Sequence, residues 1–597
     1  MVGEDTERTR RRVLRALAGT GLLSGLAGCN ALGGTSNTTD TESPTVTESA
    51  TAKAARTQTA TSTATPDQPP RIVSHSATPQ EHGQVLAFRI EAEDDTELAA
   101  VRVTYGDQKW VREDIGESPF AGENRFSGLA GDNPEGGRVE FLARDAAGQE
   151  SRKRVTPDEQ APDLSEFQVA PTRSAGEVSL TLLGEDDVGL ESLSLILDGS
   201  SQLQQDASGA TQASFDTTVD VSDAATEGET NTLTAALEDW NGNTTERDSD
   251  TYVRKFDRLT ETRLELGANY LLWAGDKFGN CFEEGANPMP SIGQYDELAA
   301  TRVRSRHIDQ MQGYGVTNVM LTFNGTASDR RLLKRFFDSD LTDQIKLRPI
   351  YTIKDYRWHP NRSHGNWKDE VVPSDMEFIH NHILDRENAH TYRGRPVVNI
   401  WNAAYLAWAD KYHEQIMDEW GSYRSFTTDL RDHLRVNDTD PFIVGGIAGG
   451  SGYHGFPNDR IVDFIRELDA TTTWVAGGAW GEDNSATWDE VLPWVEQDFQ
   501  GHREFTGEHD MEFIPTVFPG FDDRPNTCWG SDRYTPRSLD GFTSLLELAE
   551  EYRTTPMVDI ATWNDWTEGS QIEPGSFRGT DYGTAYLEAI KRFQQSS

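Results

Sequence analysis

Two carboxylic acids lie three residues apart near the end of the chain, at Asp565 and Glu568. In a helix or a tight turn this spacing places both side chains on one face, with Cβ atoms about 5–6 Å apart. Cleavage of a glycosidic bond needs one carboxyl group that stays protonated and donates to the leaving oxygen, and another that stays ionised beside the anomeric carbon. The same spacing is also that of a helix capping box, in which Glu568 would bind a backbone amide. The spacing alone leaves both interpretations open.

The elements that would position these acids lie beyond Phe256, where short apolar segments alternate with helix-like segments. The predicted strands are 266–272, 316–323, 347–353, 396–401, 442–447, 473–477, 513–518 and 557–562. The predicted helices include 296–314, 374–388, 403–434, 459–468, 488–499, 538–552 and 581–593. Eight such alternations predict an α/β fold of the (β/α)8 TIM barrel type, whose active site lies on the loops after the strands.

Polar and aromatic residues cluster directly after these predicted strands. A site for sugars needs carboxylates that bind hydroxyl groups and aromatic rings that stack on apolar C–H faces. Some tryptophans, such as Trp408 and Trp420 inside a predicted helix, are expected to fill the core instead. Glu573 either binds a hydroxyl group or only ends its loop. The predicted substrate-binding residues are Tyr270, Trp273, Asn324, Asp355, Trp401, Asn402, Asp522, Trp563, Asn564, Trp566 and Glu573.

The segment around the two acids reads Trp-Asn-Asp-Trp-Thr-Glu-Gly-Ser-Gln-Ile-Glu-Pro from Trp563, and Asp581-Tyr582-Gly583-Thr584-Ala585-Tyr586-Leu587 follows it. This string resembles the C-terminal motif of glycoside hydrolase family 99 and its family-99-like relatives, and similar barrels occur in family 71. Weaker similarities lie at 306–316, which resembles the family's helix before strand two, and at 519–523, which resembles its P-G-W-D loop. The resemblance covers about 266–593.

The resemblance implies a retaining, endo-α-mannosidase-like hydrolase in which the substrate's own 2-hydroxyl attacks the anomeric carbon. Glu568 would be the general acid/base, and Asp565 stands where the family has the Glu that acts as base on this hydroxyl. Asp565 is one methylene shorter, and a base must come within about 2.6–3.2 Å of its proton. A catalytically inactive, carbohydrate-binding cell-surface protein is therefore the alternative, and a purely structural envelope protein is a third.

The N-terminus predicts export and anchoring. An apolar run that ends at Cys29 follows the segment Thr9-Arg10-Arg11-Arg12-Val13-Leu14-Arg15. Together the two parts (1–29) resemble a twin-arginine signal joined to a lipobox. An ordinary amphipathic helix is the alternative. Cys29 would carry the lipid, which would hold the protein on the outer side of the cell membrane. Segment 30–70 is rich in Thr, Ser and Ala and has no aromatic residue, so it is expected to be a disordered stalk.

Two all-β modules are predicted at 71–158 and 159–256, before the barrel domain at 257–597. Glu93-Asp94-Asp95 and the strand after it recur as Glu185-Asp186-Asp187 and its following strand, which indicates two tandem immunoglobulin-like sandwiches. The modules could bind polysaccharide, and their Asp clusters could hold calcium. The simpler interpretation is that they are spacers with solvated acidic turns.

Composition excludes several function classes. Asp and Glu number 99 against 55 Lys and Arg, a formal net charge of -44, so bulk electrostatics oppose binding to nucleic acid or anionic lipid. This leaves the lipid anchor as the only predicted contact with the membrane, and a poly- or oligosaccharide as the predicted partner. The excess of acidic residues favours a salt-loving, haloarchaeal type of source.

Motifs of metalloproteases, NTPases and dehydrogenases are absent from the sequence, and the predicted chemistry requires no metal and no cofactor. Besides Cys29, only Cys281 and Cys528 remain. Both fall in loops on the same predicted barrel face, where they could form a disulfide outside the cell. The length of these loops leaves the pairing open.

Overall fold

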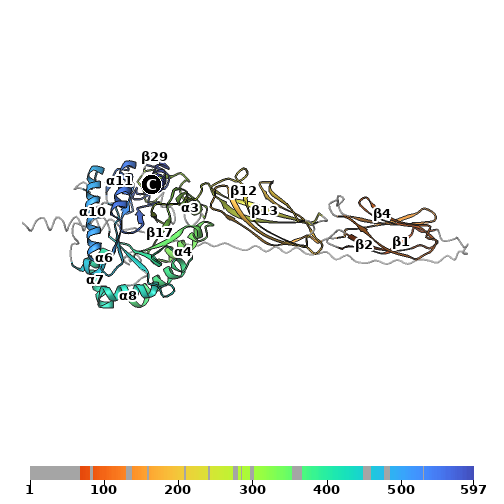
Figure 1. The fold of residues 1–597 in the computed structure, drawn as a ribbon, viewed down its shortest axis with the longest axis horizontal. Coiled ribbons are helices and arrows are strands. Elements are labelled where there is room, and N and C mark those ends of the chain that lie inside the picture. The colour runs from red at the N-terminus through yellow and green to blue at the C-terminus, as the bar shows by residue number, and fades with distance from the viewer. Residues whose placement is uncertain are drawn as a thin grey trace, which may run out of the picture.

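The computed structural model describes residues 67–80, 85–129, 138–157, 160–207, 210–239, 242–272, 280–283, 286–295, 301–352, 366–447, 459–475, 480, 484–528, 530 and 532–596. Two β modules follow one another in a row, and a larger domain of strands and helices lies at the end of the row (Figure 1). The predictions for the signal, Cys29, the stalk up to residue 66, Trp273 and Asp355 lie outside the described residues. No helix within these ranges has the length and apolar character needed to cross a membrane.

The two β modules share one strand order. The first has sheets β1-β2-β5 and β4-β3-β6-β7, and the second has β8-β9-β12 and β11-β10-β13-β14, so the repeat in the sequence is also a repeat in topology. In each module both sheets contribute to one apolar core. The strands of the first module are β1 (Arg71–Gln80), β2 (Val85–Glu93), β3 (Leu98–Tyr105), β4 (Gln108–Glu113), β5 (Phe120–Ser127), β6 (Val139–Asp145) and β7 (Glu150–Val155). Those of the second are β8 (Asp163–Pro171), β9 (Glu177–Glu185), β10 (Leu190–Leu197), β11 (Ser200–Asp206), β12 (Gln212–Asp220), β13 (Glu229–Asp239) and β14 (Thr244–Val253).

The third domain contains the predicted barrel of parallel strands. Its strands are β15 (Glu265–Tyr270), β17 (Asn318–Phe323), β18 (Lys346–Tyr351), β20 (Arg395–Ile400), β21 (Phe442–Gly446), β22 (Ala470–Thr472), β23 (Glu512–Ile514), β24 (Thr516–Val517) and β27 (Met557–Ile560). Pro515 separates β23 from β24, because proline has no N–H for the strand ladder. Since β23 pairs with β22 and β24 pairs with β27, the interrupted pair serves as the seventh of eight strand positions. The prediction of a TIM-like barrel is confirmed.

Helices surround this barrel, as Figure 1 shows. They are α3 (Thr301–Tyr314), α4 (Ala327–Phe336), α5 (Val372–Ile379) between two π-helical turns η3 (Trp367–Val371) and η4 (His380–Leu384), α6 (Ala403–Trp408), α7 (Asp410–Trp420), α8 (Tyr423–Leu434), α9 (Asp459–Ile465), α10 (Trp488–Glu508), α11 (Leu539–Tyr552) and α12 (Ala585–Gln595). Short pieces complete the domain: η1 (Thr342–Gln344), β16 (Met289–Pro290), β19 (Thr391–Tyr392), β25 (Phe521–Asp522), β26 (Tyr534–Thr535), β28 (Gly575–Phe577) and β29 (Thr580–Gly583).

Three local expectations were wrong, and one helix was not expected. The first residues of the helix expected at 581–593 lie in β29 instead, and α12 begins at Ala585. Strand six lies at Ala470–Thr472 rather than at 473–477, because its register is set by pairing with β21 and β23. The helix expected at 403–434 is three helices, broken at Ala409 and at Gly421, which has the left-handed φ of 76° that favours glycine. Helix α4 was not among the expected segments, although Thr326 and Asp329 form a capping box at its start.

The second β module is joined to the barrel by buried polar contacts. Tyr252 of β14 belongs to the barrel's hydrophobic core, and its hydroxyl donates to Asp309 of α3 at 3.2 Å. Arg254 and Asp309 form an ion pair at 3.2 Å, with side chains 0% and 1% exposed. Arg254 also donates to Gln312 at 2.7 Å. Removal of the module would therefore take away the cation that pairs with Asp309 and uncover this part of the barrel.

Arg254→Met in the full chain is expected to lower the free energy of unfolding by about 3–5 kcal/mol, because it leaves a buried charge without its partner. Chemical denaturation followed by tryptophan fluorescence measures this change. The matched control is Arg424→Met, which removes an exposed ion pair with Glu467 and should leave the transition midpoint unchanged. Equal midpoints for Arg254→Met and the wild type would show that the junction contributes nothing to stability.

Candidate active site

The loop after β27 holds both candidate acids, and it folds back tightly on the barrel. Thr562 N–H donates to the Ser570 carbonyl at 2.8 Å, and Ile572 N–H donates to the Thr562 carbonyl at 2.9 Å. Arg537 donates to the carbonyls of Gly569 and Gln571 at 2.9 and 2.7 Å. These contacts hold the loop at the C-terminal end of the eighth strand, where the barrel fold places catalytic groups.

Asp565 and Glu568 lie on one turn of this loop and are only 1% and 3% exposed. Asp565 Oδ1 accepts three hydrogen bonds: from Thr567 N–H at 3.0 Å, from the Thr567 hydroxyl at 2.6 Å and from Glu568 N–H at 3.1 Å. One half of the capping box considered from the sequence is thus present, since Asp565 caps the amide of Glu568, whereas the amide of Asp565 donates to the Thr562 hydroxyl instead of to Glu568. Asp565 Oδ2 is buried without a hydrogen-bond partner in the described residues.

The surroundings move the pKa values of the two acids by different amounts. Burial raises the pKa of Asp565 to about 6, although the hydrogen bonds from Thr567 and Glu568 lower it. Burial also raises the pKa of Glu568 well above its usual range, and the charge of Asp565 raises it further, whereas Arg533 lowers it. Glu568 is therefore the group that keeps its proton near neutral pH while Asp565 ionises, which is the division that acid–base cleavage of a glycosidic bond needs.

A buried ion pair lies beside these acids. Arg533 binds Asp523 through Nε at 2.8 Å and Nη2 at 2.5 Å, and its own N–H donates to Asp523 Oδ1 at 2.6 Å. The Arg533 guanidinium lies 5.1 Å from the ring centroid of Trp480. Asp523 stood in the motif at 519–523 beside the predicted Asp522, so its position was visible in the sequence. Arg533 and Trp480 carried no comparable signal.

Four predicted substrate contacts belong instead to a supporting network. Glu573 accepts hydrogen bonds from Tyr295 at 2.8 Å and Trp566 at 2.7 Å, and its other oxygen lies 2.9 Å from His307 Nε2. His307 Nδ1 lies 2.9 Å from the Tyr270 hydroxyl. Asn564 binds both backbone groups of Leu271. Protein partners thus bind the polar atoms of Tyr270, Asn564, Trp566 and Glu573, and these residues orient the loop. His307 and Tyr295 were not predicted, although His307 lay within the similarity at 306–316.

Other predicted residues keep buried polar atoms without partners among the residues the structure describes. These atoms are Trp563 Nε1, Asn324 Oδ1 and Asn402 Oδ1. Asn324 directly follows β17 and Asn402 lies two residues after the end of β20, so both lie at the same end of the barrel as the two acids. Buried polar atoms are rarely left without a hydrogen bond, and the hydroxyl groups of a sugar could supply it.

The two remaining predicted contacts are placed differently. Trp401 is half-buried, with its ring centroid 4.3 Å from that of Trp474 in an edge-on arrangement. Asp522 N–H donates to the Glu568 carbonyl at 2.7 Å, so the two backbones are adjacent. The Asp522 carboxylate is occupied by Arg524, at 2.7 and 2.8 Å.

Cys281 and Cys528 form a disulfide with a Cα–Cα distance of 5.1 Å. The pairing left open by the sequence is thus made in the structure. Thr527 N–H also donates to the Cys281 carbonyl at 3.0 Å. The bond ties the loop after β15 to the loop that follows β25, close to the turn with Asp522 and Asp523.

No protein-family model matches the chain, and no curated protein matches it. Among solved structures, a glycoside hydrolase-like protein has 20% identity and a TM-score of 0.44, covering 57% of this chain and 96% of its own. The GH99 endo-alpha-mannosidase from Bacteroides thetaiotaomicron has 16% identity and a TM-score of 0.38, covering 55% of this chain and 96% of its own. At these values the similarity does not transfer an activity to this chain.

Proposed function

We propose that this chain is a glycoside hydrolase that cleaves a poly- or oligosaccharide, with Glu568 as general acid/base and Asp565 as base. The observation that carries the proposal is the pair of buried carboxyl groups on the loop after β27. They are one turn apart, and their pKa values are raised to different extents. Two carboxyl groups in unlike environments are the feature that acid–base assignments in glycosidases depend on.

The finer mechanism proposed is a retaining one of the endo-α-mannosidase type. In the first step Asp565 Oδ2 takes the proton of the substrate's 2-hydroxyl as that oxygen bonds to the anomeric carbon, and Glu568 gives its proton to the departing glycosidic oxygen. In the second step water attacks the anomeric carbon and loses a proton to Glu568, the bond between that carbon and the 2-oxygen breaks, and Asp565 returns its proton to the 2-oxygen. Both acids end as they began. Because Oδ1 is fixed by three hydrogen bonds, Oδ2 is the oxygen available for this transfer.

The raised pKa values predict a bell-shaped dependence of kcat/KM on pH. Asp565 must be ionised, so the rate should rise about tenfold per pH unit below a pKa of about 6 and then level off. Glu568 must be protonated, so the rate should fall again once pH exceeds its raised pKa. Rates measured from about pH 4 to about pH 9 test this. A rate that is highest at the acidic end and declines steadily would contradict the assignment of Asp565 as base.

The proposed activity is tested with the full chain, because Tyr252 and Arg254 of the second β module pack against the barrel. The buffer contains concentrated salt, because the chain has a net charge of -44. The protein is incubated with mannan, other α-glycans and envelope polysaccharide, and newly formed reducing ends are counted. Release from one glycan supports hydrolysis, and the anomer formed first, read by NMR, separates retention from inversion. Absence of release from all of them would contradict the proposal.

A carbohydrate-binding protein without catalysis is the second candidate. The observation that favours it is the use of Asp565 Oδ1 as a cap for Thr567 and Glu568, together with the shorter side chain at this position. A glycan that binds to the full chain and remains uncut over long incubation would select this function.

We also propose that the protein is exported by the twin-arginine route and anchored through a lipid on Cys29 in a haloarchaeal type of cell envelope. The immunoglobulin-like modules at 71–158 and 159–256 would then hold the barrel domain at 257–597 away from the membrane. The row of modules before the barrel in Figure 1 supports this spacer role. Cys29→Ser should move the protein from the membrane fraction to the medium, and an unchanged membrane fraction would overturn the anchor.

A further inference from the structure

Helix α4 concentrates positive charge on a strongly acidic chain. Its ten residues include Arg330, Arg331, Lys334 and Arg335, whereas the whole chain has 55 Lys and Arg in 597 residues and a net charge of -44. The acid within the helix, Asp329, is buried and serves in the capping box at its start. The outer surface of α4 is therefore cationic.

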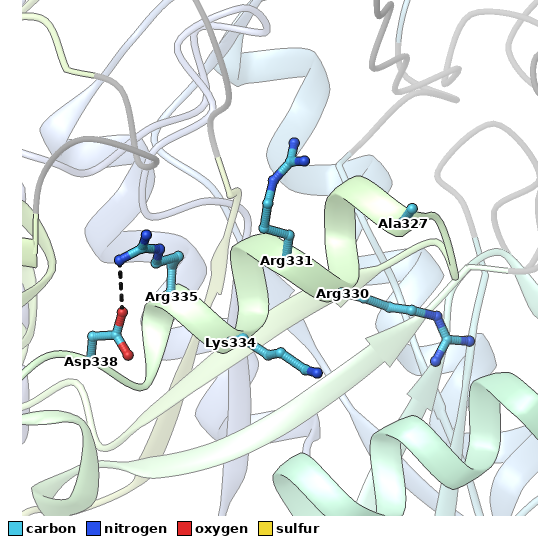
Figure 2. A pocket seen from close by; sticks show the side chains of 6 residues that line it. All are labelled: Ala327, Arg330, Arg331, Lys334, Arg335 and Asp338. Carbon is cyan, nitrogen blue, oxygen red and sulfur yellow. Dashed lines mark hydrogen bonds and ion pairs between the residues drawn. The ribbon is translucent and has the colours of Figure 1, made fainter.

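These cations line one hollow of the surface, together with Ala327 and Asp338. Figure 2 shows the four long side chains spreading from successive turns of α4, with Asp338 beside Arg335. Positions separated by three or four residues are neighbours on a helix surface. Arg330 and Lys334 are thus neighbours, as are Arg331 and Arg335, and in Figure 2 the two pairs extend to different sides of α4.

The cations differ in how firmly they are held. Arg330 is fixed, because Nη2 donates to Asp375 at 2.7 Å and the guanidinium lies 4.8 Å from the Phe378 ring centroid. Arg335 makes an exposed pair with Asp338 at 3.4 Å. Arg331 and Lys334 are exposed and form no ion pair within the part of the chain that the structure describes. Arg331 and Lys334 are thus free to bind an anion, beside an Arg330 whose position is fixed and whose charge is paired with Asp375.

The positive charges near α4 also lower the pKa of a neighbouring histidine. The pKa of His382, on η4, is lowered first by burial and then by the positive charges of Lys334, Arg330 and Arg386. Lys334 and Arg330 of α4 therefore lower the pKa of His382 although the chain as a whole is negatively charged.

We propose that this α4 surface, made of Arg331, Lys334 and Arg335 around the fixed Arg330, docks an anionic polysaccharide whose sugars carry carboxylate or sulfate groups. The proposal rests on the proposed function and narrows its substrate to a charged polymer. Helix α4 directly follows β17, and Asn324 between them lies at the same end of the barrel as the two acids. A polymer longer than the active site would continue from that end along α4, past Arg331 to Lys334 and Arg335 in its last turn.

Charge complementarity selects the occupant. Guanidinium groups bind carboxylate and sulfate oxygens through two hydrogen bonds at once. In the concentrated salt used for the full chain, about 1 M, charges more than about 3 Å away are largely screened, so the acids elsewhere on the chain do not oppose a direct contact here. An anionic membrane is less suited, because a broad membrane surface would also face the acidic residues that give the chain its net charge of -44.

The test measures binding of the full chain to polygalacturonate, dextran sulfate and neutral dextran by isothermal titration calorimetry. We expect binding to at least one of the two charged polymers and no binding to neutral dextran. Comparison of polygalacturonate with dextran sulfate shows whether carboxylate or sulfate groups are preferred. The triple variant Arg331→Gln, Lys334→Gln and Arg335→Gln should bind that polymer about tenfold more weakly, as expected for the loss of several exposed charge contacts. Its thermal midpoint should match the wild type, because all three side chains are exposed.

The matched control removes three other exposed cations, by Arg424→Gln, Arg435→Gln and Arg466→Gln. It has the same net charge as the α4 variant and should bind as the wild type does. Equal weakening in both variants would assign the binding to overall charge and overturn the proposal. Binding by wild type to phosphatidylglycerol vesicles but to neither charged polymer would also overturn it, as would no binding at all. Failure of hydrolysis with polymer binding retained would instead contradict only the proposed function.

Discussion

Glu568→Gln is expected to lower kcat for glycan hydrolysis by about 10²–10⁴-fold, the contribution typical of general acid–base catalysis. Glutamine keeps the size of the side chain but has no acidic proton to give to the leaving oxygen. The carboxyl group of Glu568 is 3% exposed and its pKa is raised by burial and by Asp565, so it carries that proton at the pH where Asp565 is ionised. Reducing ends released from the glycan identified for the wild type provide the measurement.

A substrate with a dinitrophenolate leaving group separates acid catalysis from a structural effect. This group departs without protonation, so the first step with Glu568→Gln should stay near the wild-type rate, and dinitrophenol should appear as a burst before a slow second step. Glu547→Gln is the matched control, because Glu547 lies exposed on α11 and its loss should leave the rate unchanged. Equal losses on the activated and the natural substrate would show that Glu568 does not act as the acid.

Asp565→Asn is expected to lower kcat by about 10²–10⁴-fold while the loop keeps its shape. The amide oxygen of asparagine can still accept the three hydrogen bonds that Thr567 and Glu568 donate to Oδ1. Only the charge at Oδ2, the oxygen without a partner among the described residues, is removed. Catalysis should therefore fail although capping persists, and the pH profile should lose its rise near pH 6.

Two further variants complete this test. Asp565→Ala removes the cap as well, so it should lower the thermal midpoint, which Asp565→Asn should leave close to that of the wild type. Asp565→Glu restores the longer carboxylate of the family that the motif resembles, and a gain in rate would show that reach limits the natural residue. Full activity of Asp565→Asn would establish that Asp565 is a cap and not a base.

The barrel was predictable because its evidence is local. Apolar strands and amphipathic helices alternate along the chain, and each pattern follows from side chains within a few residues of each other. Strand six was misplaced because apolar residues continue past the residues that pair with neighbouring strands. Pairing with β21 and β23 sets the strand at Ala470–Thr472. Helix α4 was not predicted because it is short and mostly charged, so few apolar residues mark its buried face. Thr326 and Asp329 nevertheless marked its start.

The sequence by itself determined the class of the domain, the chain position of the two acids and their chemical type, because all three depend on local periodicity and on a contiguous string. Tertiary structure decided the roles around them. Glu573, expected beside the sugar, became the centre of a network with His307 and Tyr295, and the pair of Asp523 and Arg533 came to lie near the acids. These contacts join residues far apart in the chain or in loops without periodicity, so their distances, and the burial that separates the two pKa values, arise only when the barrel closes.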